Sequence, residues 1–105
     1  MIFAIDMDGV LVSSVEKADY KNVKPIQKTI DIVNQLYEDG HIIKIYTSRG
    51  QTTGINQREL TEKQLKEYGI KYHELVMDKT HYDIIIEDKC LDVSRFIKNY
   101  EDLIR

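Results

Sequence analysis

Short apolar segments alternate along this chain with amphipathic helical segments, and this alternation constrains its fold more than any other feature. Residues 2–6 and 83–87 are apolar on both faces, which is typical of buried parallel strands. Residues 42–47 and 72–77 are two further strand candidates. Between these segments, apolar residues recur at helical spacing. The order of elements predicts an α/β fold, a three-layer sandwich on a mostly parallel sheet.

The helical segments carry recognisable start and stop signals. Pro25 fits the first turn of a helix that ends at Gly40. Asn56, with an acidic residue three positions later, resembles a capping box and opens a second helix that closes at Gly69. Asp92 is the expected cap of a final helix. The first apolar stripe comprises Ile26, Ile30, Val33 and Leu36, and the last comprises Val93, Phe96, Ile97, Tyr100, Leu103 and Ile104.

Length and composition exclude several classes of protein. The 105 residues predict a single domain spanning 1–105. No apolar run approaches the ~18 residues of a membrane span, and the N-terminal stretch lacks the basic region of a signal peptide. A single cysteine, Cys90, cannot form an internal disulfide, so a cytoplasmic location is expected. The net charge of −3 disfavours a nucleic-acid binder.

Polar residues stand where the predicted strands end. In parallel sheets the carboxyl ends of the strands share one edge, which is where the functional crevice lies. We therefore expect these side chains to converge. They are Asp6 and Asp8 after the first strand, Thr47, Ser48 and Arg49 after the second, Lys79 just before the last strand, and Glu87 and Asp88 just after it.

Such a cluster predicts metal-assisted phosphoryl chemistry. Gly9 lets the chain turn at once, so the second carboxylate can swing back over the first. Clustered carboxylates cannot stay ionised together without a cation, and oxygen ligands suit magnesium. One carboxylate can then attack phosphorus while the metal and Lys79 neutralise the phosphoryl oxygens. A second carboxylate can protonate the leaving oxygen and later activate water.

In this order the residues resemble the four motifs of the haloacid dehalogenase-like phosphohydrolase superfamily. The resemblance covers essentially the whole chain: Asp6-Met7-Asp8-Gly9-Val10, Ile43-Lys44-Ile45-Tyr46-Thr47, Lys79, and Ile84-Ile85-Ile86-Glu87-Asp88. It implies a Rossmann-like core without a cap domain. The run Thr47-Ser48-Arg49-Gly50 and the short length look most like small phosphatases found with capsular polysaccharide biosynthesis genes.

The resemblance also implies a role for each residue. Asp6 would be the nucleophile that becomes an aspartyl-phosphate, and Asp8 would be the general acid and base. Asp6, Asp8 (through its backbone carbonyl) and Asp88 would bind Mg²⁺. Thr47 and Lys79 would hold the phosphoryl group. The implied function is magnesium-dependent hydrolysis of a small, sugar-related phosphomonoester.

Three positions leave alternatives open. Glu87 stands where the superfamily commonly has aspartate, so it contacts the metal either directly or through water. Arg49, like Ser48, is a candidate substrate contact, because a guanidinium matches phosphate or carboxylate, but a salt bridge to the acidic cluster is an equal alternative. Residues 10–24 allow only a small flap, so the site stays open unless another subunit covers it.

Other functions compete with hydrolysis. A receiver-type signalling domain is phosphorylated on an aspartate from a mid-chain strand, whereas that strand ends here in Thr47. A non-catalytic member of the superfamily would act as a subunit or scaffold. A nucleic-acid 3′-phosphatase would suit an open site, although the acidic net charge does not favour it.

Overall fold

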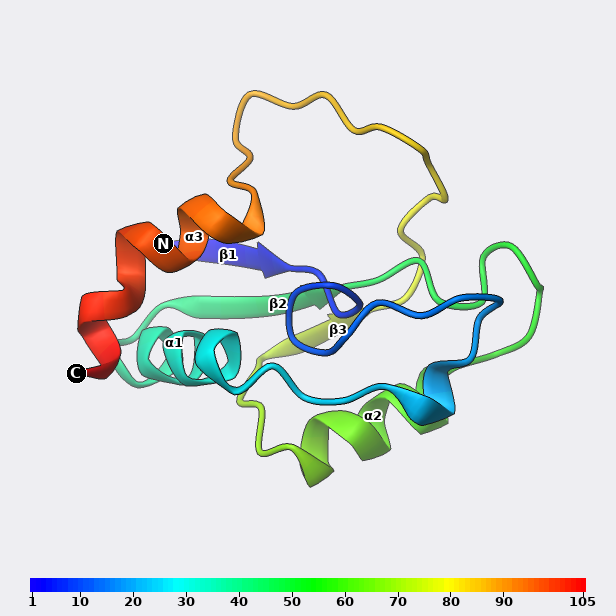
Figure 1. Cartoon of the computed structure of the whole chain (residues 1–105), viewed down its shortest axis with the longest axis horizontal. Coiled ribbons are helices and arrows are strands. Elements are labelled where there is room, and N and C mark those ends of the chain that lie inside the picture. Colours follow the sequence, from blue (N-terminus) through cyan, green and yellow to red (C-terminus); the bar gives the residue numbers. More distant parts are fainter.

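The computed structural model describes residues 1–105 and contains a three-stranded parallel sheet with helices beside it (Figure 1). Strands β1, β2 and β3 pair in that order, with Phe3 opposite Ile43 and Ile45 opposite Leu75. The α/β fold and the parallel sheet predicted from the sequence are thus confirmed. The elements are β1 (Ile2–Ile5), the 3₁₀ helix η1 (Tyr20–Asn22), α1 (Gln27–Glu38), β2 (Ile42–Tyr46), α2 (Arg58–Glu67), β3 (Glu74–Val76), α3 (Val93–Tyr100) and the 3₁₀ helix η2 (Glu101–Ile104).

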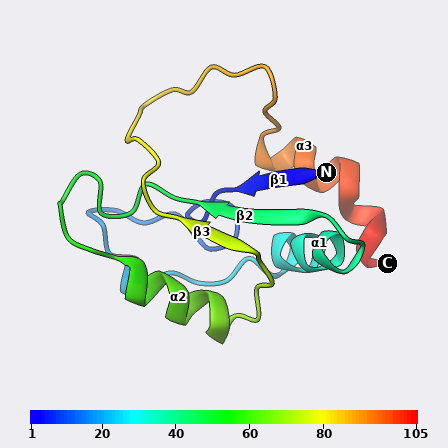
Figure 2. The ribbon, with the colours of Figure 1, turned by 180° about the vertical axis from the view of Figure 1, so that it is seen from behind.

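Only one side of the sheet is buried. Successive side chains of a strand point to opposite sides. On one side, Ile5, Ile43 and Ile45 are at most 6% exposed. On the other side, Ile2 is 66% exposed and Ile42 is 39% exposed. Figure 2 shows the sheet from behind, with no helix crossing in front of β2 or β3. The third layer predicted from the sequence is therefore not seen in the burial pattern.

Helix α1 supplies most of the apolar side chains that cover the buried side. Ile30, Ile32, Val33 and Leu36 are each at most 1% exposed, and burial of side chains of this size contributes about 1.5–3 kcal/mol apiece. The chain leaves the helix at Gly40, whose φ of +92° favours glycine, so the predicted stop is confirmed. Helix α3 packs against α1 and carries one buried residue, Phe96.

The two later helices differ in how closely their starts match the prediction. The Asp92 carboxylate accepts the backbone N–H of Arg95 at 2.8 Å, which confirms the predicted cap of α3. At α2 the residue before the first turn is Gln57, and its side chain makes no cap hydrogen bond. Asn56 instead accepts the N–H of Arg58 at 2.9 Å, two residues on, so the predicted capping box is wrong in detail. No helix is both long and apolar enough to cross a membrane.

The segment between β3 and α3 departs most from the sequence prediction. Residues 83–87 form no strand, and Ile84 and Ile86 are 81% and 92% exposed. In Figures 1 and 2 this segment arcs away from the sheet. The prediction rested on three β-branched residues in a row, but strand propensity has an effect only where a neighbouring edge pairs the segment. Strand β1 consequently lies at an edge of the sheet.

Candidate functional site

A tight turn follows β1 and places two carboxylates at the carboxyl end of the sheet. The Met7 carbonyl accepts the backbone N–H groups of Leu11 at 3.0 Å and Val12 at 3.1 Å. Gly9 has a φ of +85°, and a side chain there would meet the Ser14 hydroxyl at 3.0 Å. Met7 is fully buried in the core. Its neighbours Asp6 and Asp8 are half-buried.

Asp6 is paired with Lys79, as expected if the two act on the same group. The Lys79 Nζ donates to Asp6 Oδ2 at 3.3 Å, and the Met7 N–H donates to Asp6 Oδ1 at 2.8 Å. The side chain of Asp6 is 36% exposed, whereas that of Lys79 is only 9% exposed. Burial raises the pKa of the Asp6 carboxyl above its ordinary value, although the Lys79 charge opposes this. The carboxylate is therefore the accessible member of the pair and is more basic than a free aspartate.

Two tyrosines surround the Lys79 ammonium group. It lies 5.3 Å from the ring centre of Tyr46 and 5.0 Å from that of Tyr82. Burial alone would lower the pKa of Lys79, but its contacts with Tyr82 and Asp6 outweigh this and raise the pKa. The site therefore holds a permanent positive charge beside Asp6. Neither tyrosine was predicted at the site, because nothing in their spacing distinguishes them from packing residues.

Asp8 and Arg49 form a bidentate ion pair. The guanidinium donates from Nε to Asp8 Oδ2 at 2.9 Å and from Nη2 to Oδ1 at 2.8 Å. The Arg49 side chain has no exposed surface, whereas that of Asp8 is 22% exposed. Of the two readings of Arg49, the structure supports the salt bridge. Direct substrate contact is wrong for this arrangement, because no part of the side chain reaches solvent.

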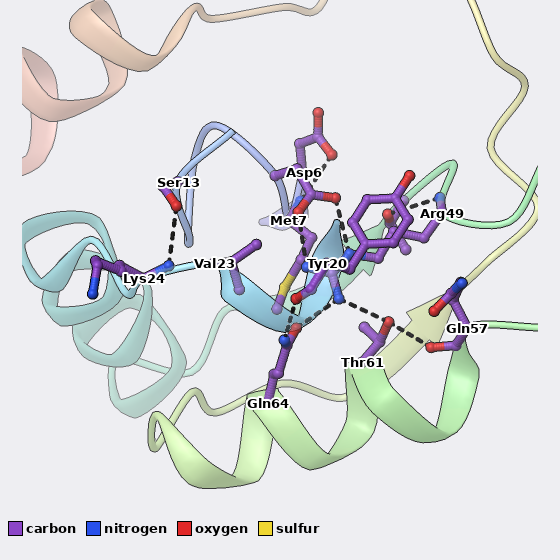
Figure 3. A network of polar contacts seen from close by, with 12 residues as sticks. Asp6, Met7, Ser13, Tyr20, Val23, Lys24, Arg49, Gln57, Thr61 and Gln64 are labelled. Atoms are coloured by element: carbon purple, nitrogen blue, oxygen red, sulfur yellow. Dashed lines mark hydrogen bonds and ion pairs between the residues drawn. The ribbon is translucent and has the colours of Figure 1, made fainter. Parts of the chain in front are cut away.

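Helix α2 anchors the other end of the guanidinium group (Figure 3). Arg49 Nη1 donates to Thr61 Oγ1 at 3.1 Å and to Gln64 Oε1 at 2.6 Å. The Tyr20 ring lies 4.7 Å from the guanidinium carbon, and Gln64 Nε2 donates to the Tyr20 carbonyl at 2.6 Å. The segment 10–24 is thus tied to α2. The sequence does carry a signal for this contact. Thr61 and Gln64 stand three residues apart on the buried face of α2, a helix with few apolar residues.

Thr47 and Ser48 lie at the carboxyl end of β2, as predicted. Thr47 is 1% exposed, and its hydroxyl accepts the Arg49 N–H at 3.2 Å. Its own backbone N–H donates to the Val76 carbonyl at 3.0 Å, which ties it to β3. Ser48 beside it is half-buried. The hydroxyl of Thr47 therefore helps to shape the turn that leads Arg49 into the interior.

The structure does not bring Asp88 and Glu87 to the other residues. Both are exposed in the segment between β3 and α3, and nowhere do three His, Cys, Asp or Glu side chains gather as metal ligands. The carboxylates of Asp6 and Asp8 already contact Lys79 and Arg49. The predicted ligand set is therefore not assembled, and this arrangement does not fit a magnesium ion. The reason is that residues 83–87 do not form the predicted strand, which would have carried Asp88 to the carboxyl edge of the sheet.

Comparisons with known proteins establish the fold and no more. No protein-family model matches the chain, and no relative was found among curated proteins. Among solved structures, a structural-genomics target from Vibrio cholerae superposes with a TM-score of 0.82 at 23% sequence identity. The match covers 98% of this chain and 95% of that one. The TM-score and the coverage show that the two proteins share an α/β fold. At this sequence identity the comparison shows the fold alone.

Proposed function

We propose that this protein is a phosphomonoester hydrolase that transfers the phosphoryl group to Asp6. The pair formed by Asp6 and Lys79 is the observation that carries the proposal. It presents a basic, accessible carboxylate beside a buried cation at the carboxyl end of the sheet. Such a carboxylate can attack phosphorus, and the cation can neutralise the phosphoryl oxygens. The resemblance to haloacid dehalogenase-like phosphohydrolases supports the same assignment.

The chain's own residues suffice to write the reaction. A carboxylate oxygen of Asp6 attacks phosphorus, and the bond from phosphorus to the ester oxygen breaks. Asp8, ionised against Arg49 at rest, takes up a proton from solvent in place of one Arg49 hydrogen bond and passes it to that oxygen, so the alcohol leaves. Asp8 then takes a proton from water, whose oxygen attacks the aspartyl-phosphate. Inorganic phosphate departs, Asp8 returns its proton to solvent, and both carboxylates are regenerated.

Magnesium enters the proposal through the resemblance alone. Asp88 lies apart from Asp6 and Asp8, so no ligand set supports the ion and no step above depends on it. The requirement for the ion is decided by measuring phosphate release with added Mg²⁺ and again after chelation. Activity that survives chelation would remove magnesium from the proposal and leave the roles of Asp6 and Asp8 in place.

The proposed substrate is a small, sugar-related phosphate of polysaccharide biosynthesis in the cytoplasm. Tyr46 and Tyr82 are each 36% exposed beside Lys79, and exposed aromatic residues suit the apolar face of a sugar ring. With only the segment 10–24 available as a flap, a second copy of the chain is the proposed cover for the site.

The test is phosphate release from a panel of sugar phosphates, with nucleoside 3′-phosphates included. We expect multiple turnovers by the wild-type protein and none by Asp6→Asn. The matched control is Asp102→Asn, which changes an aspartate that is 82% exposed in η2 and should leave turnover unchanged. Turnover by Asp6→Asn would refute the nucleophile. Uptake of a single phosphate without turnover would identify a signalling domain, and no reaction at all would indicate a scaffold.

A further inference from the structure

The site contains two buried cations, and the protein holds them in opposite ways. Four side-chain hydrogen bonds occupy the guanidinium group of Arg49. The side chain of Lys79 is only 9% exposed, yet its ammonium group makes a single hydrogen bond, to Asp6. An ammonium group has three N–H donors, so two of those on Lys79 have no oxygen or nitrogen acceptor in the protein. Lys79 is therefore the cation that can still bind an anion.

Aromatic rings stand around Lys79 where further oxygen acceptors would be expected. The Nζ atom lies 5.3 Å from the ring centre of Tyr46 and 5.0 Å from that of Tyr82, which is within the ~6 Å range of a cation–π contact. Burial of a charge is costly unless neighbouring groups compensate it, and the two rings do so together with Asp6. The rings attract the ammonium group but offer it no lone pair, so they leave its donors free.

This choice of neighbours matters for the binding of a phosphoryl group. Asp6 already balances the charge of Lys79, so a second carboxylate in place of either ring would make the site negative and repel a phosphate dianion. A second carboxylate would also form a strong charge-assisted hydrogen bond, which the phosphoryl oxygen would have to displace. A cation–π contact is weaker and adds no negative charge. The rings can therefore hold the ammonium group while its free donors turn to the phosphoryl oxygens.

We propose that Tyr46 and Tyr82 are positioning residues, which hold the Lys79 ammonium group beside Asp6 with two donors free for a phosphoryl group. This inference rests on the proposed function, in which Lys79 neutralises the phosphoryl oxygens. The tyrosines act on the phosphoryl group only through Lys79. The role depends on the aromatic ring and does not need the phenolic hydroxyl.

The experiment measures the dissociation constant of the full chain for inorganic phosphate by isothermal titration calorimetry. Inorganic phosphate carries no sugar, so a direct contact between the rings and a sugar does not enter the result. We expect Tyr46→Leu and Tyr82→Leu each to weaken binding about three- to tenfold, whereas Tyr46→Phe and Tyr82→Phe should stay within about twofold of wild type. The matched control is Tyr72→Leu, which removes a ring that precedes β3 at the opposite end of the sheet and should leave binding unchanged.

A second measurement keeps the shape of the ring and changes only its charge distribution. Phenylalanine analogues with one, two or three ring fluorines at position 46 withdraw electrons from the ring face, so phosphate binding should weaken in steps along the series. A ring that served packing alone would show no such trend. Because these analogues are nearly isosteric with phenylalanine, the series also decides the question if a leucine variant does not fold.

Each outcome decides between the explanations. Leucine variants that bind phosphate like wild type, phenylalanine variants as weak as the leucine variants, or a flat fluorine series would each overturn the positioning role. Turnover of sugar phosphates by the same wild-type protein would then leave the proposed function standing. The expected binding pattern without turnover of any phosphomonoester would overturn the proposed function and keep Lys79 as an anion site held by the two rings. A wild-type protein that neither binds phosphate nor turns over a substrate would overturn both.

Discussion

Replacement of Arg49 by methionine should destabilise the protein more than any other single change at the site. The substitution leaves Asp8 without a partner and the buried Gln64 Oε1 without a donor. Loss of one partner of a buried pair costs about 3–5 kcal/mol, and an orphaned buried acceptor costs about 1–3 kcal/mol. Because Asp8 is 22% exposed, water recovers part of the loss. We therefore expect about 3–4 kcal/mol, a large share of the roughly 5–15 kcal/mol that stabilises a small domain.

Urea unfolding followed by circular dichroism measures this loss. With an m-value of about 2 kcal/mol/M, the midpoint should fall by about 1.5–2 M. The control Arg105→Met changes a side chain that is 73% exposed and should shift the free energy of unfolding by less than about 0.5 kcal/mol. In a double-mutant cycle, Asp8→Asn and Arg49→Met should show a coupling of about 1–3 kcal/mol. A loss below about 1 kcal/mol in Arg49→Met would refute the buried ion pair.

Three further substitutions probe the charge, the exposed segment and the backbone. Burial raises the pKa of Asp6 above its ordinary value of 3.8, so the folded protein favours the protonated carboxyl. The free energy of unfolding therefore falls as pH rises through the raised pKa. Asp6→Asn should therefore be more stable than wild type at pH 7 and equal to it near about pH 3, and urea midpoints at both pH values check this. Ile86→Thr should change the free energy of unfolding by less than about 0.5 kcal/mol, because the side chain is 92% exposed, and a loss above about 1.5 kcal/mol would show that it is packed. Gly40→Ala should cost about 1 kcal/mol in thermal unfolding, since φ is +92° and no neighbour obstructs a methyl group.

The parts of the fold predicted correctly are those that local chemistry determines. The stripe of α1, its stop at Gly40 and the cap at Asp92 depend on residues within a few positions of one another. Asp6, Asp8 and Thr47 reach the carboxyl edge because their strands are parallel, and the sequence order of strands and helices already implies parallel strands.

The parts that were missed depend on partners distant in sequence. The strand predicted at 83–87 needed a free edge to pair with, and a three-residue apolar run does not show whether that edge is used. Arg49 lies 15 residues from Gln64 and 41 from Asp8, so no local pattern shows that one side chain joins them. Tyr46, which lies far from Lys79 in the sequence, was missed for the same reason, whereas Tyr82 lies close to it.

The two edges of the sheet differ in how they are protected, and the difference bears on the metal site. At the outer edge of β3, Arg58 donates to the Leu75 carbonyl at 2.8 Å and Gln51 donates to the Met77 carbonyl at 2.9 Å. These bonds block the addition of a strand. No side chain occupies the backbone groups of β1 in this way, so that edge can accept one. A parallel strand added there would end at the same edge as Asp6. If residues 84–86 formed that strand, Asp88 would follow them to the carboxyl edge of the sheet. Ile86→Thr tests whether these residues are packed. It therefore also tests this route for bringing a third carboxylate to Asp6 and Asp8.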